Sequence, residues 1–157
     1  MSTSIYQDLK STDSFKPFYN FVIIDDDSCH NIICALSIKK VFKPLNINIV
    51  GFTDAHEGIH YLETNISQQL VKTVLLLDIN MPHLSGWDVV NKIEEMPDTV
   101  KNNLIIYILS SCITKKDRQK AFMHSCVKDC IDKPLSDHLL YITEELAEAS
   151  LSRNMSA

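Results

Sequence analysis

The sequence lacks the features of several large classes of protein. No apolar run in it approaches the roughly 20 residues that a membrane-spanning helix needs. Residues 1–20 do not have the charged and then apolar layout of a secretory signal. No run of Lys or Arg exceeds two residues, and the net charge of −5 argues against a nucleic-acid-binding protein. We therefore expect a cytoplasmic protein that binds neither membrane nor nucleic acid.

Disulfide bonds are not expected either. The chain has five cysteines, an odd number, and no export signal, which predicts reduced thiols. They are Cys29, Cys34, Cys112, Cys126 and Cys130. Cys126, Cys130 and the nearby His124 raise the alternative of a metal site, but the spacing is not that of a usual zinc knuckle and no second ligand pair exists. Small buried thiols are the default interpretation.

Length and composition predict one globular domain. A chain of 157 residues, 45% hydrophobic and 22% charged, is large enough to bury a substantial core. It shows no internal repeat, no low-complexity segment and no room for a second domain. We expect a flexible tail over 1–19, a folded domain over 20–150 and a disordered tail over 151–157.

Strand and helix patterns alternate along the chain. Short apolar or β-rich runs predict strands over 21–25, 47–52, 73–78, 104–111 and 127–132. The segments between and after them predict helices over 28–42, 54–66, 86–96, 114–125 and 135–151. Strict alternation favours an α/β fold, a doubly wound five-stranded parallel sheet with helices on both faces.

Several helix ends carry local signals. Ile32, Ile33, Leu36 and Val41 recur near helical spacing, with Asp27 or Ser28 as the N-cap of their helix. Pro97 is expected to stop the third helix, and Thr114 is a candidate cap for the fourth.

Polar residues follow four of the predicted strands. In a doubly wound sheet the carboxyl ends of the strands form the binding crevice, so these residues are expected to converge on one rim. Each alone has an ordinary explanation as a turn former, cap or surface residue, and Asp27 is expected to cap a helix. The set is Asp25, Asp26, Asp27, Asp78, Ser110, Ser111, Lys133 and Pro134.

The chemistry of such a rim follows from its crowding. Carboxylates within a few ångströms repel one another, and a hard divalent cation such as Mg²⁺ relieves the repulsion. A magnesium ion beside a carboxylate and a lysine is suited to hold phosphoryl oxygens. We predict that Asp78 is a nucleophile toward phosphorus and that the Ser110 hydroxyl can hydrogen-bond the bound group.

Four motifs together resemble the receiver domain of two-component response regulators, in particular the single-domain, chemotaxis-type regulators. They are IIDDD at 23–27, LLLDINMPHLSGWD at 75–88, YILSS at 107–111 and DKPL at 132–135. The most specific element is the D-x-N-M-P-x-x-x-G pattern that begins at Asp78. The resemblance covers about residues 20–150 and implies a flavodoxin-like (βα)5 fold with strand order 2-1-3-4-5.

The resemblance also implies roles for individual residues. Asp78 would accept the phosphoryl group. Asp25 and Asp26 would hold Mg²⁺ with Asp78, Asp26 directly and Asp25 partly through water, and Asn80 would add its backbone carbonyl. Lys133 would pair with the phosphoryl oxygens, and the Lys133–Pro134 bond is commonly cis in the family. Ser110 would turn toward the phosphoryl group and draw the loop after its strand with it.

The function implied is that of a stand-alone receiver in a phosphorelay, a phosphoprotein rather than an enzyme acting on other substrates. A histidine kinase or histidine phosphotransfer protein would donate the phosphoryl group, and the aspartyl phosphate would later be hydrolysed in the same site. Because no output domain is predicted, the signal would pass to an unknown downstream protein through the face formed by 114–125, 127–132 and 135–151.

Some positions depart from the family pattern. Cys130 stands where many receivers carry an aromatic ring that turns inward on activation, and the sequence does not show whether Tyr107 substitutes for it. Cys112 and Asn80 leave the lifetime of the phosphorylated form undetermined. Met81, Pro82 and Gly86 are interpreted as structural, and Trp87 as packing.

Three alternatives remain open. A phosphatase of the haloacid dehalogenase type also uses a strand-end Asp, but it needs a second Asp where this chain has Asn80. A flavin carrier would want a Ser/Thr/Gly-rich loop after the first strand, where this chain has three acids. A receiver-like binding module that is never phosphorylated would carry the same residues.

Overall fold

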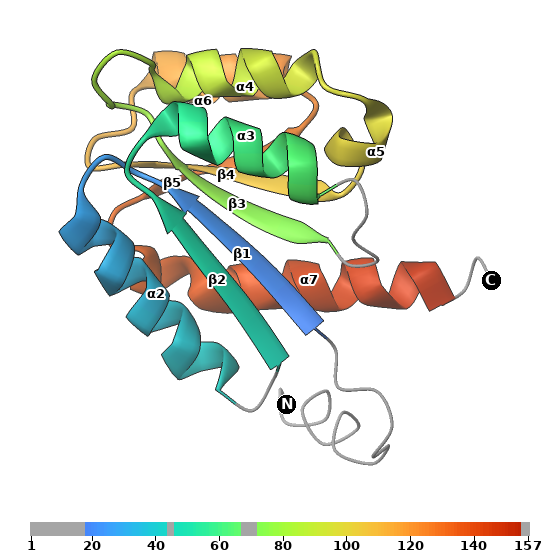
Figure 1. The fold of residues 1–157 in the computed structure, drawn as a ribbon. Helices are drawn as coiled ribbons and strands as arrows, with labels where there is room; N and C mark the ends of the chain where they lie inside the picture. Colours follow the sequence, from blue (N-terminus) through green and yellow to red (C-terminus); the bar gives the residue numbers. More distant parts are fainter. Residues whose placement is uncertain (1–17, 44–45, 67–71, 155–157) are drawn as a thin grey trace.

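A five-stranded parallel sheet lies at the centre of the molecule (Figure 1). The structure, a computed structural model of the chain, describes residues 18–43, 46–66 and 72–154. The strand order is β2-β1-β3-β4-β5, which confirms the predicted fold and order. The strands are β1 (Phe18–Ile24), β2 (Asn46–Phe52), β3 (Thr73–Asp78), β4 (Leu104–Ser110) and β5 (Val127–Asp132).

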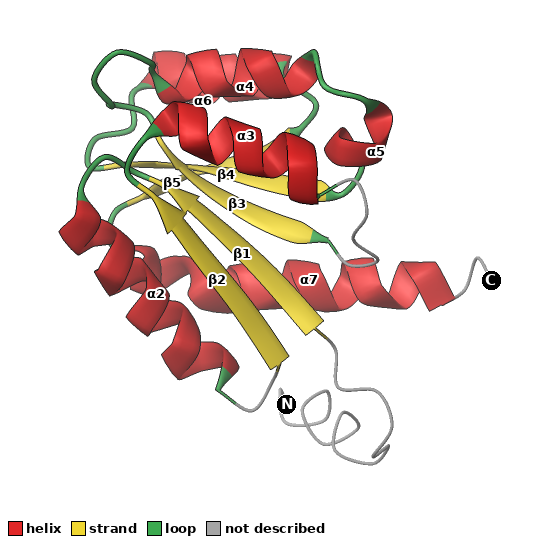
Figure 2. Cartoon of the chain, viewed as in Figure 1, coloured by secondary structure: helices red, strands yellow, loops and turns green. Residues whose placement is uncertain are grey.

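Helices cover both faces of the sheet, as Figure 2 shows. Helices α3, α4 and α6 lie over one face, and α2 and α7 over the other. Their bounds are α2 (Ser28–Phe42), α3 (Ala55–Asn65), α4 (Gly86–Glu94), α5 (Asp98–Lys101), α6 (Lys115–Met123), the 3₁₀ helix η1 (Leu135–His138) and α7 (Leu139–Asn154). Within the described residues, no helix is both long and apolar enough to cross a bilayer.

The central strand β3 is buried along its whole length. Leu75 and Leu77 point into the core under α3 and α4, while Val74 and Leu76 point into the core under α2 and α7. Alternate side chains of a strand point to opposite faces, so a strand with a helix layer on each side needs apolar residues at every position. The three leucines before Asp78 therefore mark a strand that is buried on both faces, as the sequence predicts.

The first strand begins earlier than predicted. β1 starts at Phe18, whereas the sequence suggested a tail up to residue 19 and a strand from 21. The polar Asn20 fits inside the sheet because its amide donates to the Thr73 hydroxyl at 2.9 Å and accepts from Asn48 at 2.8 Å. The rest of the predicted N-terminal tail, residues 1–17, lies outside the described residues. Of the predicted C-terminal tail over 151–157, residues 151–154 belong to α7 and residues 155–157 lie outside the described residues.

Helix α2 has the predicted bounds but not the buried face that its apolar spacing suggests. Ile32, Ile33 and Leu36 are 55–61% exposed, and of the four residues that indicated the helix only Val41 packs against the core. The buried residues are instead Cys34, Ile38 and Phe42. The ring of Phe42 fixes this choice, because it packs against Tyr19 and Phe21 with centroids 5.6 and 5.1 Å apart.

The predicted caps start their helices. Asp27 accepts hydrogen bonds from the backbone N–H groups of Cys29 and His30, at 2.8 and 3.3 Å. Thr114 and Asp117 form a capping box at the start of α6. Hydrogen bonds to Thr114 hold the pKa of the Asp117 carboxyl below its usual value, so the box is charged and intact at neutral pH.

Two short elements escaped the sequence analysis. The predicted helix over 86–96 ends at Glu94, and a new turn of helix, α5, begins directly after Pro97. The predicted last helix is split into η1 and α7. Single turns of this kind have no apolar periodicity that a sequence could show.

Tyr107 of β4 is buried completely, and its hydroxyl has no hydrogen-bond partner among the described residues. Its ring packs edge-on against Tyr141 of α7, with centroids 6.4 Å apart. The ring therefore stabilises the core while the hydroxyl is desolvated without compensation.

We predict that Tyr107→Phe leaves the free energy of unfolding unchanged or raises it by about 1 kcal/mol, because it removes only the unpaired hydroxyl. Tyr107→Ala, which removes the ring as well, is expected to lower it by about 3–5 kcal/mol. Urea denaturation of both variants measures the difference. A loss of more than about 1 kcal/mol in Tyr107→Phe would show that the hydroxyl is paired.

Candidate functional site

The carboxyl ends of β1, β3 and β5 deliver the charged residues of one site. Asp25 directly follows β1, and its backbone N–H donates to the carbonyl of Phe52 at 3.1 Å. Asp78 is the last residue of β3, and the next N–H, of Ile79, donates to the carbonyl of Leu109 at 3.2 Å. These hydrogen bonds continue the strand pairing to the ends of the strands. They therefore fix the backbone positions from which the side chains of Asp25 and Asp78 extend.

Three carboxylates gather there. One oxygen each of Asp25, Asp26 and Asp78 lies within 4.8 Å of the others. Asp25 and Asp78 are buried, 1% and 5% exposed, whereas Asp26 is exposed and opens the cluster to solvent. Within the described part of the chain, this is the one group of three or more acidic, His or Cys ligand atoms so close together.

Lys133 holds the two buried carboxylates together. Its ammonium lies 2.8 Å from Oδ2 of Asp25 and 2.9 Å from Oδ1 of Asp78. Burial alone would lower the pKa of Lys133, but the hydrogen bonds to Asp25 and Asp78 outweigh it and leave the pKa raised. Lys133 is therefore a fixed positive charge at neutral pH. The Lys133–Pro134 peptide bond is cis, as the resemblance implies.

His30 is a further partner of this cluster, which was not predicted from the sequence. Its Nδ1 lies 2.5 Å from Oδ2 of Asp25, and its side chain is 15% exposed. The other oxygen of Asp25 accepts the backbone N–H of Asp27 at 2.9 Å. A His in the first turn of a helix that follows an acidic strand end is the one signal that could have indicated this contact.

The remaining predicted residues lie at the same edge of the sheet with different environments. Ser110 is buried, and its hydroxyl bonds to the backbone of Cys112, at 3.2 Å from both the N–H and the carbonyl oxygen. Its hydroxyl is thus occupied by its own loop. Ser111 and Asn80 are exposed. Position 80 carries an amide, so it offers no carboxylic acid for a phosphatase of the haloacid dehalogenase type.

Cys130 and Tyr107 lie on opposite faces of the sheet. Cys130 lies in the core under α4 and α6, with its thiol 3.9 Å from the carbonyl of Asp117. Tyr107 lies in the other core, under α2 and α7. The two side chains point in opposite directions, so Tyr107 does not substitute for the family's ring at the position of Cys130.

Trp87 packs as predicted, and it also connects α4 to α6. It is 6% exposed, stacks on His124 with centroids 5.9 Å apart and lies under the ammonium of Lys120. Its indole N–H donates to Asp117 at 3.3 Å. Helix α6 has no buried residue of its own, so these edge contacts carry much of its attachment.

The alternative of a metal site at Cys126, Cys130 and His124 is not supported. His124 and Cys126 both approach Glu94, at 2.8 and 3.9 Å, while Cys130 turns to Asp117. All five cysteines are unpaired. Cys34 and Cys130 are buried as expected, but Cys29 and Cys112 are exposed and Cys126 is half-buried, so buried thiols were predicted wrongly for those three.

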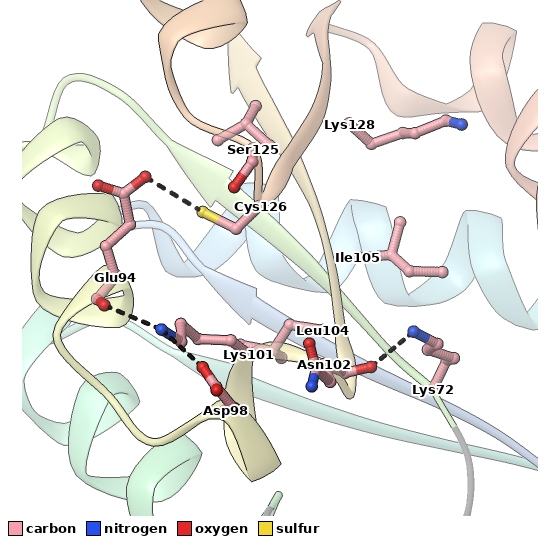
Figure 3. Close-up of a pocket in the computed structure, with 11 residues that line it drawn as sticks. Lys72, Glu94, Asp98, Lys101, Asn102, Leu104, Ile105, Ser125, Cys126 and Lys128 are labelled. Atoms are coloured by element: carbon pink, nitrogen blue, oxygen red, sulfur yellow. Dashed lines mark hydrogen bonds and ion pairs between the residues drawn. The ribbon is translucent and has the colours of Figure 1, made fainter.

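A second hollow, of about 630 Å³, opens near the amino ends of β4 and β5 (Figure 3). Its charged groups are already engaged: Lys101 contacts Asp98 at 3.0 Å and the Glu94 carbonyl at 3.3 Å, and Lys72 donates to the Asn102 carbonyl. These charged groups are therefore held by neighbouring protein groups. The carboxylate cluster at the opposite end of the sheet is the stronger candidate site.

The donor set of that cluster fits a hard divalent cation. Three carboxylate oxygens are close enough to share one ion, and oxygen ligands with an open side suit Mg²⁺. One lysine charge does not balance three carboxylates, so the pocket keeps an excess of negative charge that a divalent cation would neutralise.

Comparison with known proteins agrees with this geometry. Residues 21–143 match the response regulator receiver domain family. The chain is 29% identical over 122 residues to the sensor histidine kinase CheAY of Helicobacter pylori, covering 78% of this chain and 14% of that protein. It is 26% identical over 135 residues to the two-component response regulator ARR22 of Arabidopsis thaliana, covering 86% of this chain and 87% of that protein.

The fold agrees as well. The crystal structure of a two-component response regulator from Cytophaga hutchinsonii is similar with a TM-score of 0.74 and 23% identity, covering 83% of this chain and 97% of that one. At this identity the likeness concerns the fold alone.

Gly86 keeps the loop after β3 close to the site. Its N–H donates to the carbonyl of Ile79 at 2.9 Å, and a Cβ placed on it would lie 2.3 Å from the backbone oxygen of Asp78. Its φ is not positive, so the requirement for glycine comes from this close approach and not from a turn.

We predict that Gly86→Ala lowers the free energy of unfolding by about 1–3 kcal/mol, although alanine favours helices. The backbone oxygen of Asp78 cannot move aside as a flexible side chain could, so the clash displaces the strand end that carries the site. Gly51→Ala is the matched control, because its nearest neighbour would lie 3.6 Å away. Equal urea midpoints for the two variants would contradict the prediction.

Proposed function

This chain belongs to the response regulator receiver domain family, and we propose that it is a phosphoacceptor in a two-component phosphorelay, with Asp78 as the residue that is phosphorylated. The observation that carries the proposal is the position of Asp78. It is a nearly buried carboxylate with one oxygen paired to Lys133 at 2.9 Å, and two further carboxylates lie beside it. A nucleophile held next to a fixed cation is suited to a reaction that moves negative charge onto phosphoryl oxygens.

The reaction that we propose is an in-line displacement. An oxygen of Asp78 attacks the phosphorus of a phosphohistidine on a histidine kinase or phosphotransfer protein, and the phosphorus–nitrogen bond breaks. The products are an acyl phosphate on Asp78 and a free histidine on the donor. Water later attacks the same phosphorus and releases inorganic phosphate, which returns Asp78 to a carboxylate.

Lys133 has two tasks in this scheme. Before transfer its ammonium offsets the repulsion between Asp25 and Asp78. During transfer the same ammonium is close enough to Asp78 to pair with the phosphoryl oxygens. Its raised pKa keeps it charged throughout.

Asp25, Asp26, Asp78 and the backbone carbonyl of Asn80 are the groups that would hold Mg²⁺. When bound, the ion supplies positive charge that stabilises the phosphoryl oxygens in the transition state. Asp25 is held in place by Lys133, His30 and the N–H of Asp27, whereas Asp26 is exposed and has room to adjust to a ligand.

Output is proposed to begin at Ser110. In the structure its hydroxyl bonds to the backbone of Cys112, and turning it toward a phosphoryl group on Asp78 would exchange these bonds for a charge-assisted one. The loop leads into α6, which has no buried residue and exposes Phe122 and Met123 by 90% and 82%. A shift of α6 would alter the face that it forms with β5 and α7, where a downstream protein would bind.

The exposed face of α2 is where we propose that the phosphodonor docks. Ile32, Ile33 and Leu36 project into solvent one to two turns after the cap residue Asp27. Farther along, Lys39 and Lys40 of the helix and Lys43 at its C-cap line a hollow of about 540 Å³ with Leu36 and Ile47. A donor helix with apolar residues near its phosphohistidine and acidic residues farther away would match this pattern.

Phosphorylation by a small-molecule donor tests Asp78 as the acceptor. Incubation with acetyl phosphate and Mg²⁺ is expected to add one phosphoryl group to the wild type and none to Asp78→Asn, since the amide is not a nucleophile. Asp98→Asn, at the other end of the sheet, is the matched control and should be phosphorylated normally. Intact mass measures the gain, with and without Mg²⁺. No gain in the wild type under any condition would favour a receiver-like module that only binds partners.

Substitution of an exposed residue of α2 tests the docking site of the donor. Ile33→Glu is expected to slow phosphotransfer from the histidine kinase or phosphotransfer protein that serves the wild type best, by about 10-fold or more. Phosphorylation by acetyl phosphate should be unchanged, because the small donor does not use α2. Phe122→Glu, an exposed apolar residue on α6, is the control and should leave both rates unchanged. An equal loss with both donors would place the effect of Ile33→Glu in the site itself.

A further inference from the structure

His30 makes a contact that the proposed phosphorylation does not use. Its Nδ1 meets Oδ2 of Asp25 at 2.5 Å, while Lys133 reaches the same oxygen from β5 at 2.8 Å. Asp25 is therefore held by three donors, of which the backbone N–H of Asp27 is the third. Among them only His30 and the Asp27 N–H are independent of Asp78, because Lys133 divides its ammonium between the two carboxylates.

The tautomer of His30 follows from its neighbours. A carboxylate oxygen only accepts hydrogen bonds, so Nδ1 carries the hydrogen that faces Asp25. The thiol of Cys34, one turn further along α2, contacts the same ring, with its sulfur 3.5 Å from Nε2 and 3.8 Å from Nδ1. Burial, with a contribution from the Asp25 charge, raises the pKa of Cys34 to about 11, so the thiol keeps its proton and lies against the imidazole as a neutral group.

The position of the ring is fixed from the backbone as well. Asp27 caps the N–H groups of Cys29 and His30, so the first turn of α2 is anchored to the loop that carries Asp25. Asn31 adds a bond from its amide to the backbone carbonyl of Asp25 at 3.0 Å. The imidazole thus approaches Asp25 from a rigid helix end.

We propose that His30 is a positioning residue, which orients the Asp25 carboxylate for a divalent cation through its Nδ1–H, while the Cys34 thiol packs against the ring. The inference rests on the metal site of the proposed function. When Lys133 turns to phosphoryl oxygens, its hold on Asp25 weakens, and His30 keeps the carboxylate in place. Groups that orient a metal ligand typically change metal affinity by about 10- to 100-fold when they are removed.

The test compares divalent-cation binding by three variants and the wild type at a single pH. Binding of Mn²⁺ is followed by electron paramagnetic resonance, which counts the free ion, and Mg²⁺ is measured by competition. His30→Leu removes the donor and keeps the bulk, so we expect binding to weaken about 10-fold or more. His30→Asn places an amide N–H near the position of Nδ1 and should stay within about 3-fold of the wild type. His60→Leu, on the exposed side of α3, is the matched control.

The outcomes separate this inference from the proposed function. If the wild type binds neither ion, the metal site of the proposed function fails, and the positioning role fails with it. If the wild type binds and His30→Leu binds equally well, only the positioning role is overturned. An equal loss in His30→Asn and His30→Leu, with both folded by urea denaturation, would also overturn it, because the donor would then not be what matters.

Discussion

The contact of Lys133 with Asp25 and Asp78 is the interaction on which the site depends. Two nearly buried carboxylates beside a third would repel strongly without a cation between them. Lys133 reaches both from the end of β5, 108 residues beyond Asp25, so the ion pair exists only once β1, β3, β4 and β5 have assembled in this order. The order of the strands thus brings Lys133 to Asp25 and Asp78. In turn, these ion pairs connect the ends of β1, β3 and β5, which are far apart in the sequence.

The same arrangement limits how a change at Asp78 can reach the surface. Cys130 and Tyr107 lie on opposite faces of the sheet, so the ring of Tyr107 cannot reach the space beside Cys130. Two parts are free of core packing of their own. One is the loop after β4, where Ser110 bonds to the backbone of Cys112. The other is α6, which has no buried residue and is held by the bond of Asp117 to Trp87 and the ion pair of Arg118 with Asp129, at 4.0 Å. Edge contacts of this kind exchange at lower cost than core packing.

Features that depend on neighbouring residues were predicted from the sequence, and contacts between distant residues were not. Asp27 and Thr114 start helices because their side chains bond to N–H groups two or three residues away, and β3 is recognisable because both of its faces are apolar. The spacing of apolar residues indicates helix α2 but not its buried face, because apolar residues surround that helix, and the rings of Tyr19 and Phe21 decide that Phe42 turns inward. Asn20 and His30 depend on partners that the fold supplies, so their polar character looked like that of surface residues.

Helix α2 joins the two halves of the proposed function. Its inner side carries Cys34 and His30 against Asp25, and its outer side exposes Ile32, Ile33 and Leu36. Both sets of side chains belong to one helix, so a partner that packs on the outer side contacts the element that holds a carboxylate of the site. The exposed side chains of Ile32, Ile33 and Leu36 bury little apolar area in the isolated fold. A partner that covers them during the reaction would account for apolar residues at these positions.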